Sequence, residues 1–171
     1  MKKSLVIALC CITVLFAACK KEKPNEKFIG DYKGSCLVDP TVTMENPLIP
    51  GQTITQEIDD ITIPMEVTIS AGAEDDQIVL TYKPEGQDRT YTFNGTINKN
   101  NVVDFGIVNL NETYDGYTVN ASVDMTGTLV ERVFSLTGTI NGTATTPLFE
   151  VPVNITGDMT AVLNKVTNTT K

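Results

Sequence analysis

The chain has 171 residues, of which 41% are hydrophobic and 20% are charged, and its formal net charge is −8. This acidic balance argues against nucleic acid or anionic lipid as a partner, because both are bound through basic surfaces. The chain contains no histidine, so it lacks the central residue of Ser-His-Asp and Cys-His catalysis and the usual general base near neutral pH.

Residues 1–18 have the layout of an export signal. A positively charged start, Met1-Lys2-Lys3, precedes an apolar run over residues 5–18 that only Thr13 interrupts. As a helix this run is about 21 Å long, whereas the hydrocarbon core of a bilayer is about 30 Å thick. We therefore interpret residues 1–18 as a cleaved signal peptide rather than as a membrane span.

The apolar run ends in two alanines followed by a cysteine. The sequence Leu15-Phe16-Ala17-Ala18-Cys19 resembles the lipobox of bacterial lipoproteins, in which small residues precede an acylated cysteine. The resemblance implies that Cys19 becomes the first mature residue and carries acyl chains that anchor the protein firmly. We expect an exported, lipid-anchored protein of the cell envelope, at the outer membrane. The alternative is an ordinary cleaved signal and a free secreted protein.

The cysteine count then leaves one thiol in the mature chain. Cys10 and Cys11 leave with the signal and Cys19 takes lipid, so Cys36 remains alone and no intramolecular disulfide is possible. We interpret Cys36 as a small buried hydrophobe at a strand position. A reactive thiol and a disulfide between two chains are the alternatives.

A short charged segment connects the lipid to the rest of the protein. Residues 19–27 contain Pro24 and Asn25 and show no apolar periodicity. We expect a flexible tether there, followed by a single all-β domain over residues 28–171. This length is sufficient for one hydrophobic core.

The domain sequence alternates with the period of two that a half-buried strand requires. In residues 61–70 the odd positions are apolar and the even positions are polar or proline, and Pro64 predicts an edge or a poorly paired point. A longer alternating series covers residues 149–163, and we expect a bend or break near Pro152 or Gly157. Further strands are expected over residues 28–38, 77–82, 89–97, 101–110, 117–125 and 127–140.

Residues 39–60 interrupt this series of short strands and turns. The segment contains Pro40, Pro47, Pro50 and Gly51 with apolar residues between them. We expect a long loop at the mouth of the fold, which either covers one end of the core or gates a ligand site.

About eight sequential strands, joined mostly by hairpins, favour an antiparallel meander that closes into a barrel or folds over as a sandwich. The first strand opens with Phe28-Ile29-Gly30-Asp31-Tyr32-Lys33-Gly34. This stretch resembles the opening of calycin-like or lipocalin-like domains in small bacterial lipoproteins, where a glycine is followed two residues later by an aromatic residue. The resemblance implies an eight-stranded barrel able to hold an apolar ligand, although such a barrel can equally be filled by its own side chains.

The candidate ligand-binding residues are Tyr32, Tyr91, Phe93 and Tyr117, aromatics in the apolar phase of their strands that could line a cavity. The alternative is that they only fill the core. The sequence contains no CxxC pair, phosphate loop or dinucleotide motif, and we assign no catalytic residue, metal ligand or cofactor. The favoured function is non-enzymatic binding of a small apolar ligand. The alternative is a protein–protein interaction or assembly module of the envelope.

Overall fold

The computed structural model describes residues 22–86, 88–114, 117–146 and 149–167, and the side chains of residues 112, 114, 117, 146 and 149–151 lie outside this description. The described residues include no helix with the length and apolar character needed to cross a membrane. They form the strands β1 (Gly30–Glu45), β2 (Thr53–Glu57), β3 (Ile61–Ala71), β4 (Gln77–Tyr82), β5 (Tyr91–Ile97), β6 (Val102–Tyr114), β7 (Tyr117–Val130), β8 (Val133–Thr146) and β9 (Phe149–Lys165).

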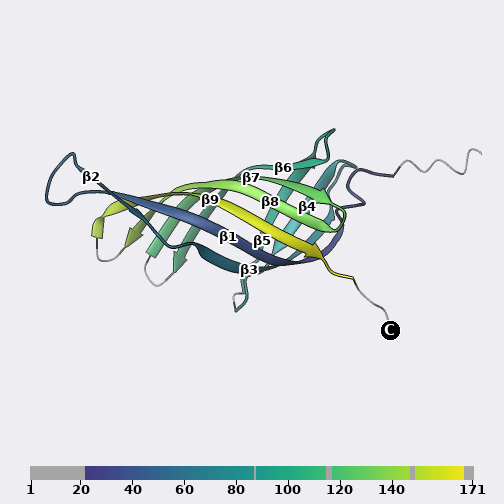
Figure 1. Cartoon of the computed structure of the whole chain (residues 1–171), viewed down its shortest axis with the longest axis horizontal. Coiled ribbons are helices and arrows are strands. Elements are labelled where there is room, and N and C mark those ends of the chain that lie inside the picture. Colours follow the sequence, from purple (N-terminus) through teal and green to yellow (C-terminus); the bar gives the residue numbers. More distant parts are fainter. Residues whose placement is uncertain (1–21, 87, 115–116, 147–148, 168–171) are drawn as a thin grey trace, which may run out of the picture.

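The strands pair in chain order and close into a ring (Figure 1). From β3 to β9 each strand pairs antiparallel with its neighbour in sequence, and β1 pairs with both β3 and β9. Eight strands therefore form a closed barrel, and β2 lies outside the ring on one edge of β1. The pairing confirms the predicted antiparallel barrel and excludes the sandwich.

Alternation along each strand decides which side chains enter the barrel. In β3, Met65, Val67 and Ile69 are buried and the residues between them are exposed, as the sequence predicted. Ile61 and Ile63 have the same phase but remain exposed. The burial of this face of β3 therefore changes along the barrel axis.

The prediction of a long loop over residues 39–60 is wrong. β1 continues through this region to Glu45, and β2 returns beside it as the second strand of a hairpin. Pro40 fits within β1 because proline lacks only the hydrogen-bond donor, and its carbonyl oxygen accepts a hydrogen bond from the Ile58 amide at 3.1 Å. The alternating polar and apolar residues of 41–45 were the signal for a longer strand.

The turn between β7 and β8 lies further along the chain than the sequence predicted. The strand predicted over residues 127–140 has the wrong start, because Val130 pairs with Val133 across a two-residue turn. Gly127 lies within β7 instead, where an added Cβ would come within 2.5 Å of the Phe134 ring. This glycine marks close packing and not a turn.

β9 runs without a break through Gly157. A Cβ at Gly157 would overlap the carbonyl oxygen of Asp39, so the missing side chain lets β1 and β9 approach each other closely. The predicted irregularity near Pro152 is confirmed, since the register between β8 and β9 shifts at this end of the pair.

The segment before β1 folds against the end of the barrel where β1 begins. Asn25 is only 3% exposed, and its side-chain amide donates to the carbonyl oxygens of Glu74 and Gln77 at 3.3 and 3.1 Å. The Lys165 ammonium group donates to the carbonyl oxygen of Lys27 at 3.0 Å. The described part of the predicted flexible tether is thus packed on the barrel and does not extend away from it.

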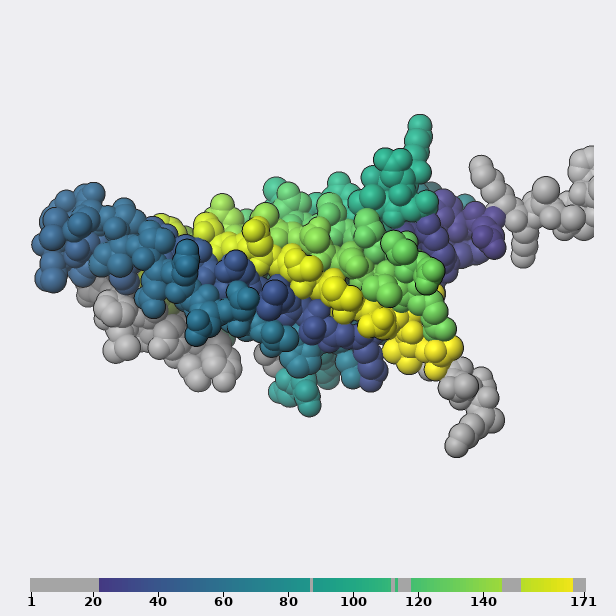
Figure 2. All heavy atoms as spheres, viewed as in Figure 1, coloured from purple at the N-terminus to yellow at the C-terminus, as the bar shows by residue number. Residues whose placement is uncertain are grey.

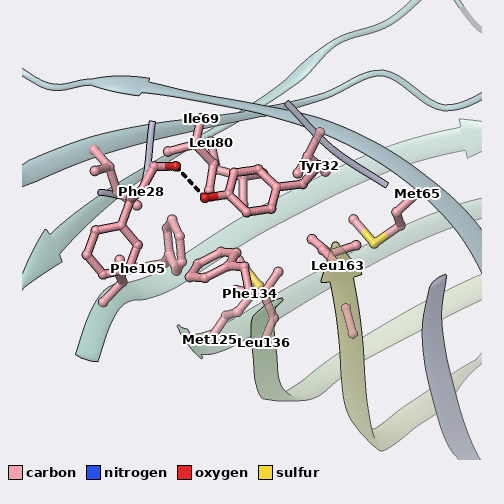
Figure 3. Packing of buried hydrophobic residues seen from close by; sticks show 14 of the residues in the cluster. Phe28, Tyr32, Met65, Ile69, Leu80, Phe105, Met125, Phe134, Leu136 and Leu163 are labelled. Carbon is pink, nitrogen blue, oxygen red and sulfur yellow. Dashed lines mark hydrogen bonds between the residues drawn. The ribbon is translucent and has the colours of Figure 1, made fainter. Parts of the chain in front are cut away.

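Large buried side chains fill this end of the barrel, which we call the closed end (Figure 3). The rings of Phe28 and Tyr32 each lie 5.9 Å from the ring of Phe134, measured between centroids. The Tyr32 hydroxyl donates to the Phe28 carbonyl oxygen at 2.7 Å. Tyr32 is fully buried, and burial raises its pKa to about 12. The closed end is therefore packed like an ordinary protein core.

Candidate ligand cavity

The opposite end of the barrel, which we call the open end, has an incomplete wall. β3 pairs with β4 only over residues 67–71, and β5 pairs with β6 at only two positions. In the described pairing, residues 61–66 of β3 therefore have no partner in β4, and residues 106–114 of β6 have none in β5. Pro64 lies in this part of β3, where it pairs with Ser35 of β1 and has no partner in β4. This confirms the predicted edge, where a proline is tolerated because it cannot donate to a neighbouring strand.

A cavity of about 520 Å³ occupies the barrel toward the open end. Every strand of the ring contributes to its lining, and most of the lining side chains are aliphatic or aromatic. Examples from different strands are Val38, Met65, Leu80, Leu110, Ile140 and Met159. The volume lies within the range of about 300–1,000 Å³ that is usual for small-molecule sites, which are mostly apolar with a few polar groups.

The lining includes four groups that can form hydrogen bonds through their side chains, on Cys36, Tyr82, Glu85 and Tyr91. Burial raises the pKa of the Cys36 thiol, which keeps the sulfur protonated and weakly nucleophilic. Burial also raises the pKa of Tyr82, with a smaller contribution from Cys36. Among the described residues of the lining Glu85 is the one that is charged, and it is exposed in the turn after β4. The interior is therefore neutral, and its charge lies near the opening.

Two tyrosines form an aromatic wall where the β4–β5 turn begins. Tyr82 and Tyr91 are opposite each other in the register, and their rings stack with centroids 6.3 Å apart. The Arg89 guanidinium carbon lies 5.7 Å from the centroid of the Tyr91 ring, within reach of a cation–π interaction. These contacts hold flat apolar surface at the edge of the cavity.

The residues predicted to bind ligand fall in different parts of the molecule. Tyr91 and Phe93 line the cavity. Tyr32 is packed in the closed end against Phe28 and Phe134, so its surroundings are those of a core residue. Tyr117 begins β7, but its side chain lies outside the described residues, as does Cys19.

The aliphatic residues of the cavity were missed because the sequence prediction selected aromatics. Val38 has the same strand phase as Cys36, and Ile63 has the same phase as Met65, so their inward orientation could have been predicted. Their depth along the barrel could not have been predicted in this way. It depends on where β4 and β5 stop, which is a property of the pairing.

Comparison with protein-family models gives no match for this chain, and comparison with curated proteins gives none either. Among the described residues, no group of three or more His, Cys, Asp or Glu side chains is placed to hold a metal ion. The features of the described residues that bear on function are therefore the shape and chemistry of the cavity.

Proposed function

We propose that this protein is a lipid-anchored, non-enzymatic binding protein of the cell envelope that holds a small apolar molecule in its barrel. The observation that supports this proposal is the cavity of about 520 Å³ with its largely apolar lining. Each Å² of apolar surface that leaves water contributes about 25 cal/mol, so an apolar ligand gains free energy over the whole lining. A charged ligand finds one charged partner, Glu85, near the opening.

The anchor gives the cavity an orientation. Cys19 carries the lipid in this proposal, and Lys23 is already held on the barrel by an ion pair with Asp75 at 2.8 Å. Four residues of extended chain reach about 14 Å, so the closed end lies near the membrane that holds the lipid. The open end then faces away from that membrane, and the ligand exchanges on the far side.

The test is binding of the uncharged fluorescent probe N-phenyl-1-naphthylamine to residues 19–171 carrying Cys19→Ser. This chain keeps every described residue and cannot be acylated. We expect saturable binding with one site. Val38→Phe, which fills part of the cavity, is expected to weaken binding at least about tenfold, the factor expected when roughly 1.4 kcal/mol of apolar contact is lost. Ile107→Phe is the control, because Ile107 is 69% exposed on β6.

Cys36 provides a second readout that locates the probe. It is the single thiol of this test chain, it is almost fully buried, and it lines the cavity. A molecule bound in the cavity should slow alkylation of Cys36 in the folded protein. No binding, or binding that Val38→Phe and Ile107→Phe weaken equally, would contradict the proposed function.

A further inference from the structure

The hairpin between β1 and β2 ends in an ordered loop, residues 46–51, which we call the hairpin tip. The Asn46 amide donates to the Gln52 carbonyl oxygen at 2.7 Å, and the Asn46 side chain also binds the Gln52 side chain at 3.0 Å. The Leu48 amide donates to Asn46 Oδ1 at 3.0 Å, and the Gly51 amide donates to Glu45 Oε1 at 3.2 Å. The hairpin tip is therefore fixed by its own hydrogen bonds.

This fixed loop presents apolar side chains to water. Leu48 is 87% exposed and Ile49 is 54% exposed, and Pro47 and Pro50 flank them. Two large apolar side chains therefore project together from a backbone that hydrogen bonds hold in place. Leu48 is the most exposed large hydrophobic residue of the described chain.

The hairpin tip lies at the end of the molecule opposite the N-terminal segment (Figure 1). In the space-filling view it forms the blue extremity of the elongated protein (Figure 2), and residues 22–29, in purple, lie at the other extremity. β1 has 16 residues, which at about 3.3 Å each extend over roughly 50 Å. The first described residues of the chain and the hairpin tip therefore lie at opposite ends of the protein.

One face of the hairpin links the tip to the cavity. Met44 is opposite Ile54 in the register, and Val38, which lines the cavity, is opposite Ile61. Met44 and Val38 have the same phase in β1, so both pairs lie on the face that continues the barrel interior. Ile54 and Ile61 are 42% and 47% exposed. On β1 this face continues through Val42 and Pro40, whereas Gln56 interrupts it on β2, so the apolar path from the tip toward the cavity runs along β1.

We propose that the hairpin tip docks on a lipid surface other than the one that holds the anchor. The apolar area of a Leu or Ile side chain is on the order of 100 Å², so Leu48 and Ile49 offer roughly 200 Å² of apolar surface, less than half of the apolar part of the approximately 800 Å² per partner of a stable protein interface. Insertion into the boundary between headgroups and acyl chains requires no matching surface and suits a small rigid projection.

The charges around the hairpin tip specify the kind of lipid. Residues 40–60 contain four acidic residues, Glu45, Glu57, Asp59 and Asp60, and no lysine or arginine. Anionic headgroups would be repelled by this segment, so the surface it fits is zwitterionic. Two inserted side chains give weak, reversible docking, as expected from the marginal membrane binding of a single acyl chain. If the proposed function holds, docking also places the apolar path of the hairpin against the lipid from which a ligand leaves or to which it returns.

The test uses the absence of tryptophan from the chain. Leu48→Trp, in residues 19–171 with Cys19→Ser, introduces a single indole at the hairpin tip. With phosphatidylcholine vesicles we expect a blue shift of its emission and quenching by brominated acyl chains. Val130→Trp is the matched control, because Val130 is 69% exposed and ends β7 at the closed end. Neither change is expected at that position.

Sedimentation with the same vesicles tests the hairpin tip without an added indole. Leu48→Ser is expected to lower the partition coefficient by about tenfold or more, since a buried leucine is lost. Replacing half of the phosphatidylcholine with phosphatidylglycerol should lower it as well. No shift for Leu48→Trp, equal shifts for Leu48→Trp and Val130→Trp, or equal sedimentation of Leu48→Ser and the unsubstituted protein would overturn the proposal. These results do not depend on occupancy of the cavity, which the probe experiment measures separately.

Discussion

The two ends of one barrel are built from the same strands and are packed in opposite ways. At the closed end, Phe28, Tyr32 and Phe134 lie in mutual contact and are fully buried. At the open end, β4 and β5 stop, and a cavity of about 520 Å³ remains between the longer strands. Under the proposed function this is a division of labour, in which the packed half stabilises the ring and the hollow half binds the ligand.

The largest expected effect is the loss of an aromatic ring at the closed end. Phe134→Ala leaves a cavity beneath Phe28 and Tyr32 and should reduce the free energy of unfolding by about 3–5 kcal/mol. Phe93→Ala, in the lining of the open half, should cost less than half as much, because Phe93 already borders empty space. Urea unfolding of both variants measures the difference. Equal losses would show that the two halves are packed alike.

Adding volume should also destabilise the closed end more than the open half. Val103 is fully buried at the closed end, and Val103→Phe overpacks it, at an expected cost of about 1–3 kcal/mol in unfolding free energy. Val123 lines the cavity, so Val123→Phe has room and should change stability by less than about 0.5 kcal/mol. Thermal unfolding of the two variants, with the same substitution at each position, is the measurement. A larger loss of unfolding free energy for Val123→Phe than for Val103→Phe would contradict the presence of a cavity in the open half.

The buried hydroxyl of Tyr32 gives the closed end a pH dependence. Its pKa is raised from 10.0 to about 12 by burial, so the unfolded chain loses this proton at lower pH than the folded protein. The stability contribution is complete below pH 10 and is lost between about pH 10 and 12, at about 1.4 kcal/mol per pH unit. Tyr32→Phe should remove this dependence of the unfolding free energy on pH. It should also cost about 1–2 kcal/mol near pH 7, because the Phe28 carbonyl oxygen loses its 2.7 Å partner.

The control for this pH effect is Tyr82→Phe, in the open half. Burial raises the pKa of Tyr82 as well, but Tyr82 is only partly buried, so its contribution to the alkaline slope should be smaller. Unfolding curves at pH 7, 9 and 11 separate the two tyrosines. If Tyr32→Phe and the unsubstituted protein lost the same unfolding free energy between pH 9 and pH 11, the Tyr32 hydroxyl would titrate as if it were exposed.

The smallest expected effect concerns the charge at the opening. Glu85 is exposed, so its interaction with a ligand headgroup is screened and should change affinity by a factor of about 2–5 at most. Glu85→Gln should weaken displacement of N-phenyl-1-naphthylamine by dodecylamine, strengthen displacement by dodecanoate, and leave dodecanol unchanged. A change in all three displacements by one factor would assign Glu85 a role in packing and not in charge.

The fold could be predicted from the sequence to the extent that it depends on local alternation. The buried face of β3, the barrel class and the irregularity near Pro152 follow from periodicity and proline chemistry. The extension of β1 through Pro40 was missed, because three prolines and a glycine in residues 39–60 were weighted above the alternation of residues 41–45. The turn at Glu131 and Arg132 carries no glycine, and Gly127 offered a misleading alternative nearby.

The cavity could be predicted only in part, for a physical reason. Phe93 and Tyr32 have the same inward phase in their strands, yet one lines a cavity and the other fills a core. What separates them is position along the barrel axis relative to the ends of β4 and β5. That position is set by pairing between segments far apart in the sequence. The periodicity within one strand gives no information about this pairing.

The measurement that tests the division of labour most directly is native mass spectrometry of residues 19–171 with Cys19→Ser after incubation with a lipid extract of the cell envelope. We predict a discrete added mass that disappears on denaturation, is lost in Val38→Phe and persists in Ile107→Phe. A clean unliganded mass for the unsubstituted protein, or an added mass that Val38→Phe retains, would contradict the assignment of the open half as a ligand site.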